Sequence, residues 1–280
     1  MTFINLSNIH GQQSAIADCC TARKQKTLDM KIKFATLNIW EGGKMFDSVV
    51  SFVKKEDPDI VLMQEVRNGK NPKFEKRFRI IEILKKELGY PSSVFSPAFL
   101  NTVAIGKVEE GNAIFSRFPI IHDKVRFFDN QYGEFNSIYS KHFELIPAIL
   151  QHAVIEFENL KLNIFNVHGI WGLDGKDNRR RLKMSETIVN EIKDKGNVVL
   201  AGDFNSLPNT KTIQNIEKYL INVFKDELTT TFNMKQKDKE GYATSVVDMV
   251  FVSKNIKVLD YSCPSVDISD HLPLVCVFDL

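Results

Sequence analysis

From residue 31 onward, hydrophobic positions recur along the chain at two spacings. Residues 32–39 are read as a strand, and the continuous apolar run at residues 60–66 is typical of a strand that is buried on both faces. Apolar side chains recur at helical spacing over residues 46–53 and 74–88, which predicts a helix after each of these strands. The first third of the chain is therefore expected to alternate between strands and helices.

The rest of the chain contains more strand-like runs than helical ones. Residues 156–163 resemble a hairpin connection between two strands. Helices interleaved with hairpin-linked strands predict an α/β (α+β) fold with mixed sheets in a single domain. The expected strands cover residues 111–120, 147–157, 160–170, 197–204, 245–253, 256–262 and 272–280, and the expected helices cover 178–195 and 208–220.

The first 29 residues differ in character from the rest of the chain. They contain neither a basic start nor a continuous apolar stretch, so they do not resemble a secretory signal. Met30 then opens the strand-like run "MKIKFATLNIW". We expect residues 1–29 to form a loosely ordered extension and residues 30–280 to form the folded domain.

Composition and charge describe an ordinary globular protein. Hydrophobic residues make up 43% of the chain, and the formal net charge is +2. A nearly neutral chain has no global basic field for nucleic acid, so any phosphate-bearing partner must be held by local groups. The four cysteines lack zinc-site or disulfide-framework spacing, and no apolar run approaches the length of a membrane span. We expect a monomer without a transmembrane segment, located in the cytoplasm.

Polar residues recur at the ends of the predicted strands. Each has an ordinary structural explanation: Glu65 as a solvated strand end, His168 as a core or turn histidine, and Asp203 with Asn205 as an Asx-type turn. Asp248 lies within the apolar run "VVDMVFV", where a carboxylate is costly to bury unless it is paired, and a histidine is an obvious partner. The set comprises Asn38, Glu65, His168, Asp203, Asn205, Asp248, Asp270 and His271.

Carboxylates gathered at one edge of a sheet need a counter-charge. Glu65, Asp203, Asp248 and Asp270 would repel one another there, and a divalent cation removes that repulsion. Oxygen ligands with nearby amides favour Mg²⁺ or Mn²⁺ over zinc. Together with two histidines, such a site matches metal-assisted attack of water on phosphorus.

An ordered set of short motifs resembles the endonuclease/exonuclease/phosphatase superfamily, whose fold is that of deoxyribonuclease I. The motifs are "LNIW", "MQEV", "GNAIFSRFPI", "NVHG", "GDFNSLP", "VVDMVFVS" and "SDHLPL", and the resemblance spans residues 34–280. It implies two mixed β-sheets packed as a sandwich and flanked by helices. It also implies a Mg²⁺-dependent phosphoric ester hydrolase.

The resemblance also implies a metal site. Glu65 would be the principal ligand, with Asn38 beside it. Asp270 would lie at a second or shifted metal position. The implied ion is Mg²⁺ or Mn²⁺.

The catalytic roles that the resemblance implies fall on five residues. Asp203 would orient or deprotonate the attacking water, and Asn205 would contact the phosphate. His271 would stabilise the charge that builds on the phosphoryl oxygens, held in its tautomer and charge state by Asp248. His168 lies where family members place a residue near the leaving group, so it and Asn205 would also bind substrate.

Several features bear on the substrate. Base-excision members usually carry an acidic residue at the position of Trp40, which argues against an abasic-site endonuclease. Loops at residues 127–145 and 225–245 combine aromatic residues with lysines; such residues stack bases and hold phosphates, or simply pin a loop to the core. The basic run at 178–181 is either a phosphate clamp or a solvated helix face.

Three functions remain open. We favour a phosphodiesterase or nuclease that acts on nucleic acid. The alternative is a hydrolase of a small or lipid phosphoester, such as an inositol phosphate or a sphingomyelin-like head group. A binding module without activity is the third, and the complete set of site residues argues against it.

Overall fold

Two β-sheets packed face to face form the centre of the protein. The computed structural model describes residues 1, 31–103, 106–136, 143–158, 160–237 and 245–280. In these residues the first sheet has the strand order β12 (Lys257–Ser262), β13 (Leu274–Asp279), β1 (Lys31–Asn38), β2 (Ile60–Arg67), β4 (Gly106–Ser116), β3 (Ser92–Val103) and β6 (Glu134–Phe135). The second has the order β10 (Ile221–Asn222), β11 (Asp248–Val252), β9 (Val198–Asp203), β8 (Leu160–His168), β7 (Ile149–Phe157) and β5 (Ile120–Phe127).

Both sheets are mixed. Strands β1 and β2 run parallel, as do β8 and β9, whereas β13, β4, β7 and β11 pair antiparallel with their neighbours. The predicted α/β (α+β) class, with two mixed sheets packed as a sandwich, is therefore confirmed.

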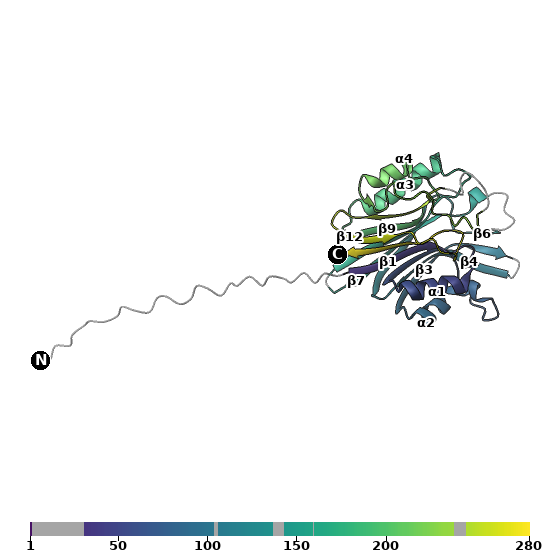
Figure 1. The fold of residues 1–280 in the computed structure, drawn as a ribbon, viewed down its shortest axis with the longest axis horizontal. Coiled ribbons are helices and arrows are strands. Elements are labelled where there is room, and N and C mark those ends of the chain that lie inside the picture. The colour runs from purple at the N-terminus through teal and green to yellow at the C-terminus, as the bar shows by residue number, and fades with distance from the viewer. Residues whose placement is uncertain (2–30, 104–105, 137–142, 159, 238–244) are drawn as a thin grey trace.

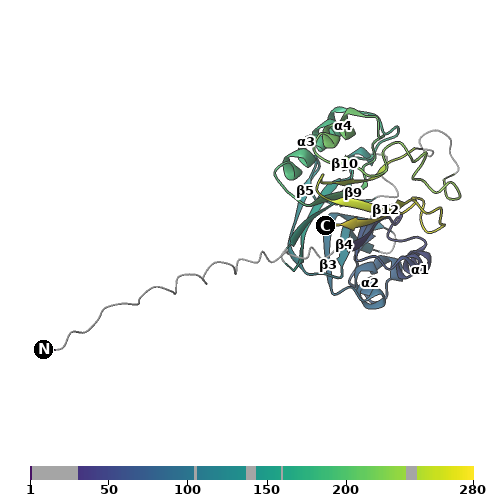
Figure 2. The ribbon, with the colours of Figure 1, turned by 60° about the vertical axis from the view of Figure 1, so that its left-hand side comes forward.

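Helices cover the outer face of each sheet. Figures 1 and 2 show α1 (Phe46–Glu56) and α2 (Ile80–Leu88) on one side of the sandwich, and α3 (Arg179–Ile192) and α4 (Lys211–Glu217) on the other. Short 3₁₀ turns, η1 (Lys76–Phe78) and η2 (Phe143–Leu145), lie in two of the loops. The expected flanking helices are confirmed.

The hydrophobic core follows from the alternation of side chains along each strand. In β1, Phe34 points into the cluster between the sheets, whereas Ala35 and Leu37 point into the cluster under α1 and α2. The same holds in β9, where Val199 faces the other sheet and Leu200 packs under α3 and α4. Strands with two buried faces appear in sequence as continuous apolar runs, as predicted.

A buried polar network joins the two sheets. Gln64 Nε2 of β2 donates to Asn166 Oδ1 of β8 over 2.7 Å. Asn166 Nδ2 in turn lies 3.1 Å from the carbonyl oxygens of Met63 and Ala113 and from Gln151 Oε1. These bonds tie side chains and backbone of both sheets together just behind the strand ends.

The second predicted helix is shorter than its hydrophobic pattern. The pattern covers residues 74–88, but α2 begins at Ile80. Residues 76–78 form the 3₁₀ turn η1, and Arg79, with φ −133° and ψ 35°, pairs with Asn68 in a β-bridge, so the α-helix starts after it. Phe74 packs instead on Phe78 and Val108 in a small separate cluster.

Residues 2–30 lie outside the described part of the chain, so the expected extension at residues 1–29 stays a prediction. Parts of the two substrate loops, residues 137–142 and 238–244, also lie outside it. Among the described residues, no helix combines the length and apolar character needed to cross a membrane.

Candidate active site

Three of the predicted site residues lie at one level across adjacent strands of the second sheet. His168 at the end of β8 is the register partner of Asp203 at the end of β9, and Asp203 is the partner of Asp248 at the start of β11. Because β11 runs antiparallel to β9, its first residue meets the last residue of β9. The register therefore places the three side chains at the same edge of the sheet.

The first sheet brings Asn38 and Glu65 to the same place. Asn38 ends β1, and its register partner in the parallel strand β2 is Gln64, which precedes Glu65. Asn38 Nδ2 donates to Glu65 Oε1 over 3.0 Å and to Asp203 Oδ2 over 3.2 Å. This amide thus connects the acidic residues of the two sheets.

Glu65 is held in a conformation that is unusual for a strand. Its φ is 58°, and the register between β2 and β4 shifts between Met63 and Val66. A bulge of this kind re-aims a side chain, and a non-glycine residue with positive φ persists only where its surroundings hold it. Here the backbone N–H of Glu41 donates to Glu65 Oε2 over 2.6 Å.

The surroundings keep Glu65 ionised. Burial opposes ionisation, but the positive field of His168 and the hydrogen bonds from Glu41 and Asn38 outweigh it, and the pKa of Glu65 falls below its usual value. His271 adds to the same effect. Glu65 is therefore a carboxylate over the physiological pH range.

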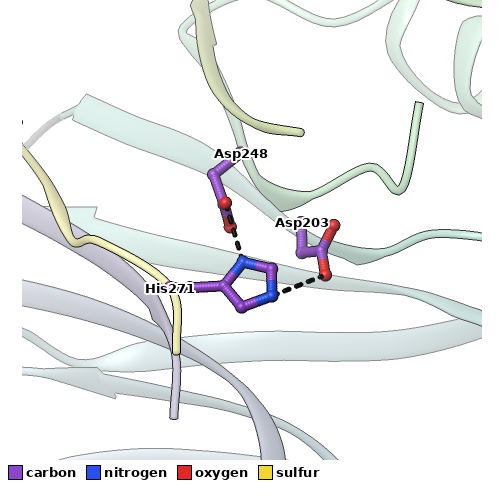
Figure 3. Close-up of side chains that lie close together, drawn as sticks. All are labelled: Asp203, Asp248 and His271. Carbon is purple, nitrogen blue, oxygen red and sulfur yellow. Dashed lines mark hydrogen bonds and ion pairs between the residues drawn. The ribbon is translucent and has the colours of Figure 1, made fainter. Parts of the chain in front are cut away.

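His271 lies between two aspartates, as Figure 3 shows. Its Nδ1 is 2.9 Å from Asp248 Oδ2, and its Nε2 is 4.0 Å from Asp203 Oδ2. Burial alone would lower the pKa of His271, but Asp248, then Asp270 and Asp203, raise it to about 10. His271 is accordingly an imidazolium near neutral pH, with Nε2 directed at Asp203.

Asp203 and Asn205 form a tight turn after β9. Asn205 has a φ of 50°, a region in which asparagine is enriched, and its N–H donates to Asp203 Oδ1 over 2.8 Å. Asn205 Nδ2 lies 3.3 Å from the carbonyl oxygen of Gly169. His168 Nε2 is 3.9 Å from Asp203 Oδ2. Asp203 is thus the shared neighbour of both histidines.

A cavity of about 660 Å³ opens at this edge of the sandwich. Its volume lies in the range that holds a molecule of nucleotide or drug size. Asn38 and Asp248 stand behind its wall, where they bond the side chains that line it. The predicted site residues that line the cavity are Glu65, His168, Asp203, Asn205, Asp270 and His271.

Asp270 differs from the other predicted ligands. Its Oδ2 is 2.7 Å from Lys237 Nζ, and its Oδ1 lies 3.4 Å from Ser269 Oγ. The carboxylate is therefore already paired with a cation from the chain itself. Its role as a metal ligand stays a prediction.

The cavity also contains residues that the sequence did not single out as site residues. Glu110 lines it and bonds Arg67 Nε and Asn101 Nδ2, each over 2.7 Å. Burial raises the pKa of Glu110, Arg67 counteracts that effect, and Glu65 adds to it. In the sequence, the position of Glu110 directly before the "GNAIFS" motif was the only feature that could have marked it as a site residue.

The basic run at 178–181 divides between exposed and buried positions, and Arg179 is exposed, as expected for a solvated helix face. Arg181 is fully buried and donates to the carbonyl oxygens of Ile170 and Lys176 over 3.2 and 2.7 Å. Arg180 pairs with Asp129. Arg181 therefore anchors the loop after His168, and residues of that loop line the cavity.

In the described part of the chain, two groups of side chains bring possible ligand atoms for a metal ion together. Asp203, Asp248 and His271 present ligand atoms within 4.8 Å of one another. Asp248 already occupies the Nδ1 side of His271, so this trio is better described as an Asp–His pair facing Asp203. Glu65 and Asn38 offer a carboxylate and an amide oxygen, the hard ligands that Mg²⁺ and Mn²⁺ prefer.

Comparison with known proteins agrees with the fold. The profile of the Endonuclease/Exonuclease/phosphatase family matches residues 35–271. A protein of that family from Beutenbergia cavernae is similar in structure, with a TM-score of 0.65 and 18% identity over 89% of this chain and 72% of that chain. No curated protein sequence matches the chain.

Two further solved structures carry more specific names. A mannosyl-6-phosphatase from Bacteroides thetaiotaomicron superposes with a TM-score of 0.64 and 19% identity, over 89% of this chain and 100% of that chain. TDP2 from Caenorhabditis elegans superposes with a TM-score of 0.63 and 16% identity, over 90% of this chain and 75% of that chain. At these identities the likeness concerns the fold, whereas the family follows from the profile match: the chain belongs to the Endonuclease/Exonuclease/phosphatase family of phosphoester hydrolases.

Proposed function

We propose that the protein is a Mg²⁺- or Mn²⁺-dependent phosphodiesterase that hydrolyses nucleic acid by attack of water on phosphorus. One observation carries the proposal: an ionised Glu65, Asp203 and an imidazolium His271 line the same cavity. Acceptors for a water proton and a donor for a phosphoryl oxygen therefore lie side by side. This is the arrangement that phosphoester hydrolysis needs.

Glu65 and Asn38 are the residues proposed to hold the ion. Asn38 Oδ1 accepts one hydrogen bond, from the Trp40 N–H over 3.1 Å, and an amide oxygen has a second lone pair. The carboxylates of Glu65, Asp203, Asp248 and Asp270 also create a negative field that a divalent ion balances. A bound ion would act as a Lewis acid toward the phosphoryl oxygen.

The remaining steps fall to the chain's own residues. Asp203 Oδ2 faces the cavity beside both histidines, so it is placed to accept the proton of the attacking water. His271 meets the negative charge on the phosphoryl oxygens through Nε2, and Asp248 holds the ring and its charge. Asn205 contacts the phosphate, and His168 donates a proton to the leaving oxygen.

The aromatic lining of the cavity favours a nucleic acid substrate. The chain has two tryptophans, Trp40 and Trp171, and both line the cavity. Trp40 follows β1 of the first sheet, and Trp171, which is 48% exposed, follows β8 of the second. Indole rings stack bases irrespective of their sequence, at about 1–3 kcal/mol per base.

A small phosphoester is the second candidate. The formal net charge of +2 provides no general attraction for a polyanion, and the cavity wall contains several carboxylates. One structural neighbour is named as a mannosyl-6-phosphatase. An inositol phosphate, a sugar phosphate or a sphingomyelin-like lipid would fit the same chemistry.

A substrate panel separates the two candidates. The purified protein is assayed with Mg²⁺ on linear and nicked DNA, RNA, an aryl phosphodiester, mannose 6-phosphate and sphingomyelin. We expect cleavage of the nucleic acids and the aryl diester, full loss with EDTA, and recovery with Mg²⁺ or Mn²⁺. Asp203→Asn and His271→Ala should each reduce kcat by about a hundredfold or more, because each removes a group that acts in the transition state.

Lys161→Ala serves as the control, since Lys161 is exposed on β8 away from the cavity lining. Release of phosphate from monoesters alone would reject the nuclease proposal in favour of the small-ester candidate. Activity that survives full chelation would reject the metal-dependent mechanism.

A further inference from the structure

Lys237 places a positive charge inside the proposed active site. Its Nζ is 2.7 Å from Asp270 Oδ2, and both residues line the cavity. The side chain of Asp270 is 8% exposed, and that of Lys237 is 33% exposed. Asp270 is thus largely shielded from solvent. Water and salt therefore weaken the attraction between these two charges less than they weaken that of an exposed surface ion pair.

The segment that carries Lys237 is fastened to the turn that carries Asp270. Asn233 N–H donates to the carbonyl oxygen of Asp270 over 2.9 Å, and Leu272 N–H donates to that of Thr231 over 2.7 Å. Lys237 N–H donates to the carbonyl oxygen of Asn233 over 3.0 Å. The ammonium also lies 5.1 Å from the centroid of the Phe232 ring, a cation–π contact that adds to its pairing with Asp270.

Asp270 adjoins the residues proposed to hold the metal ion. Ser269 Oγ donates to the carbonyl oxygen of Asn38 over 2.7 Å, so the Asp270 turn is bonded to the end of β1. Asn38 in turn bonds Glu65. Without Lys237, Asp270 would present a free carboxylate beside the proposed ion site, the kind of hard oxygen ligand that a second divalent ion takes.

We propose that Lys237 is a tethered cation that fills the cation position at Asp270, so that the protein binds a single divalent ion, at Glu65 and Asn38. The inference rests on the proposed metal-dependent function and departs from the expectation that Asp270 is itself a ligand. An ammonium has three N–H donors, and Asp270 takes one of them. Lys237 therefore also offers donors to a phosphate oxygen in the cavity.

Mn²⁺ binding to the substrate-free protein tests this directly. Unbound Mn²⁺ is counted by electron paramagnetic resonance during titration of metal-free protein. We expect about one Mn²⁺ per chain for the unaltered protein and about two for Lys237→Met, because methionine fills the space and leaves the Asp270 carboxylate uncompensated.

A double variant isolates Asp270 without changing the net charge of the site. Lys237→Met with Asp270→Asn removes one positive and one negative charge together. We expect it to bind about one Mn²⁺, with an affinity within about threefold of the unaltered protein. If Asp270 were a ligand of the resident ion, this variant would lose about tenfold or more in Mn²⁺ affinity, which would overturn the inference.

Two controls keep the result specific to Lys237. Lys235→Ala removes an exposed lysine from the same segment, outside the cavity lining, and should leave one Mn²⁺ bound. Lys237→Arg keeps the charge and should do the same. Circular dichroism melting checks that Lys237→Met is folded; if it is not, the double variant alone decides.

The outcomes distinguish this inference from the proposed function. Two Mn²⁺ ions on the unaltered protein, or a single ion on folded Lys237→Met, would overturn the role of Lys237 while leaving metal dependence intact. No Mn²⁺ binding at any of these proteins would overturn both.

Discussion

At the scale of single residues, His271 shows how burial and charge compete. The ring is almost fully buried, and burial by itself favours the neutral form. Asp248 at 2.9 Å reverses this, with help from Asp270 and Asp203, and the pKa rises from 6.5 to about 10. The charge on His271 is therefore a product of its partners, and removing Asp248 should remove the charge.

Asp248→Asn should restore the effect of burial. In the metal-free protein we expect His271 to titrate near pH 10, and in Asp248→Asn to titrate well below that value. Nitrogen-15 NMR of the imidazole rings measures both. His152 is an internal reference, because burial lowers its pKa to about 4 in either protein. An unchanged His271 titration in the variant would contradict the assigned partnership.

The same shift has a consequence for stability. A raised pKa means that the folded protein binds the proton more tightly than the unfolded chain does. The stabilisation from His271 is complete below about pH 6.5 and is lost as the pH rises through about 10. Alkaline pH should therefore lower the free energy of unfolding more in the unaltered protein than in Asp248→Asn.

At the scale of elements, the turn after β9 depends on a glycine that precedes Asp203. Gly202 has a φ of +134°, and a Cβ added there would lie 2.2 Å from the carbonyl oxygen of Val167 on β8. Glycine allows both the unusual backbone angle and the close approach of the neighbouring strand. Asp203 is positioned by this local geometry as much as by its own hydrogen bonds.

Gly202→Ala should accordingly destabilise the protein. We expect a loss of about 2–4 kcal/mol in the free energy of unfolding, from the strained φ and the backbone clash together. Urea unfolding followed by circular dichroism measures it. Gly196→Ala is the matched control, because no atom lies within 4 Å of the added Cβ and its φ is not in the positive region. Equal urea midpoints for the two variants would show that β8 and β9 accommodate a Cβ at position 202 without loss of stability, and would contradict this role of Gly202.

The spacing of apolar residues predicts helices and strands better than it predicts where they begin and end. Strands such as β2 and β9 are recognisable in the sequence because both of their faces are buried. The helix predicted from residue 74 begins only at Ile80, because Arg79 pairs with Asn68 in a β-bridge and is therefore not part of the helix. The bulge that turns Glu65 leaves no trace in a hydrophobic pattern, since it depends on pairing with β4.

At the scale of the whole molecule, the site depends on how the two sheets are joined. Asn38 and Glu65 come from one sheet, and His168, Asp203 and Asp248 come from the other. A small slide of one sheet over the other would separate Asn38 from Asp203, which lie 3.2 Å apart. The buried network around Asn166 opposes such a slide, because its bonds reach Gln64, Met63 and Ala113 of the first sheet.

Asn166→Ala tests this role. It leaves buried acceptors and donors without partners, so we expect a loss of about 2–5 kcal/mol in the free energy of unfolding. Thermal melting and urea unfolding measure the loss, with Lys161→Ala on the same strand as an exposed control. A cost similar to that of the control would mean that the network does not hold the sheets in register.

The amino-acid sequence alone indicates most of the strands and helices, which of their faces are buried, and which polar residues lie at strand ends, although β3 and β5 were not among the predicted strands. These properties depend on the spacing of apolar side chains and on the cost of burying an unpaired carboxylate such as Asp248. The pairing of distant residues is settled only in the folded chain. Folding places His271 between Asp248 and Asp203, Lys237 on Asp270, and Asn166 against Gln64. Strand order and register decide which residues pair in this way. These residues are far apart along the chain, so the hydrophobic periodicity of the sequence does not reveal their contact.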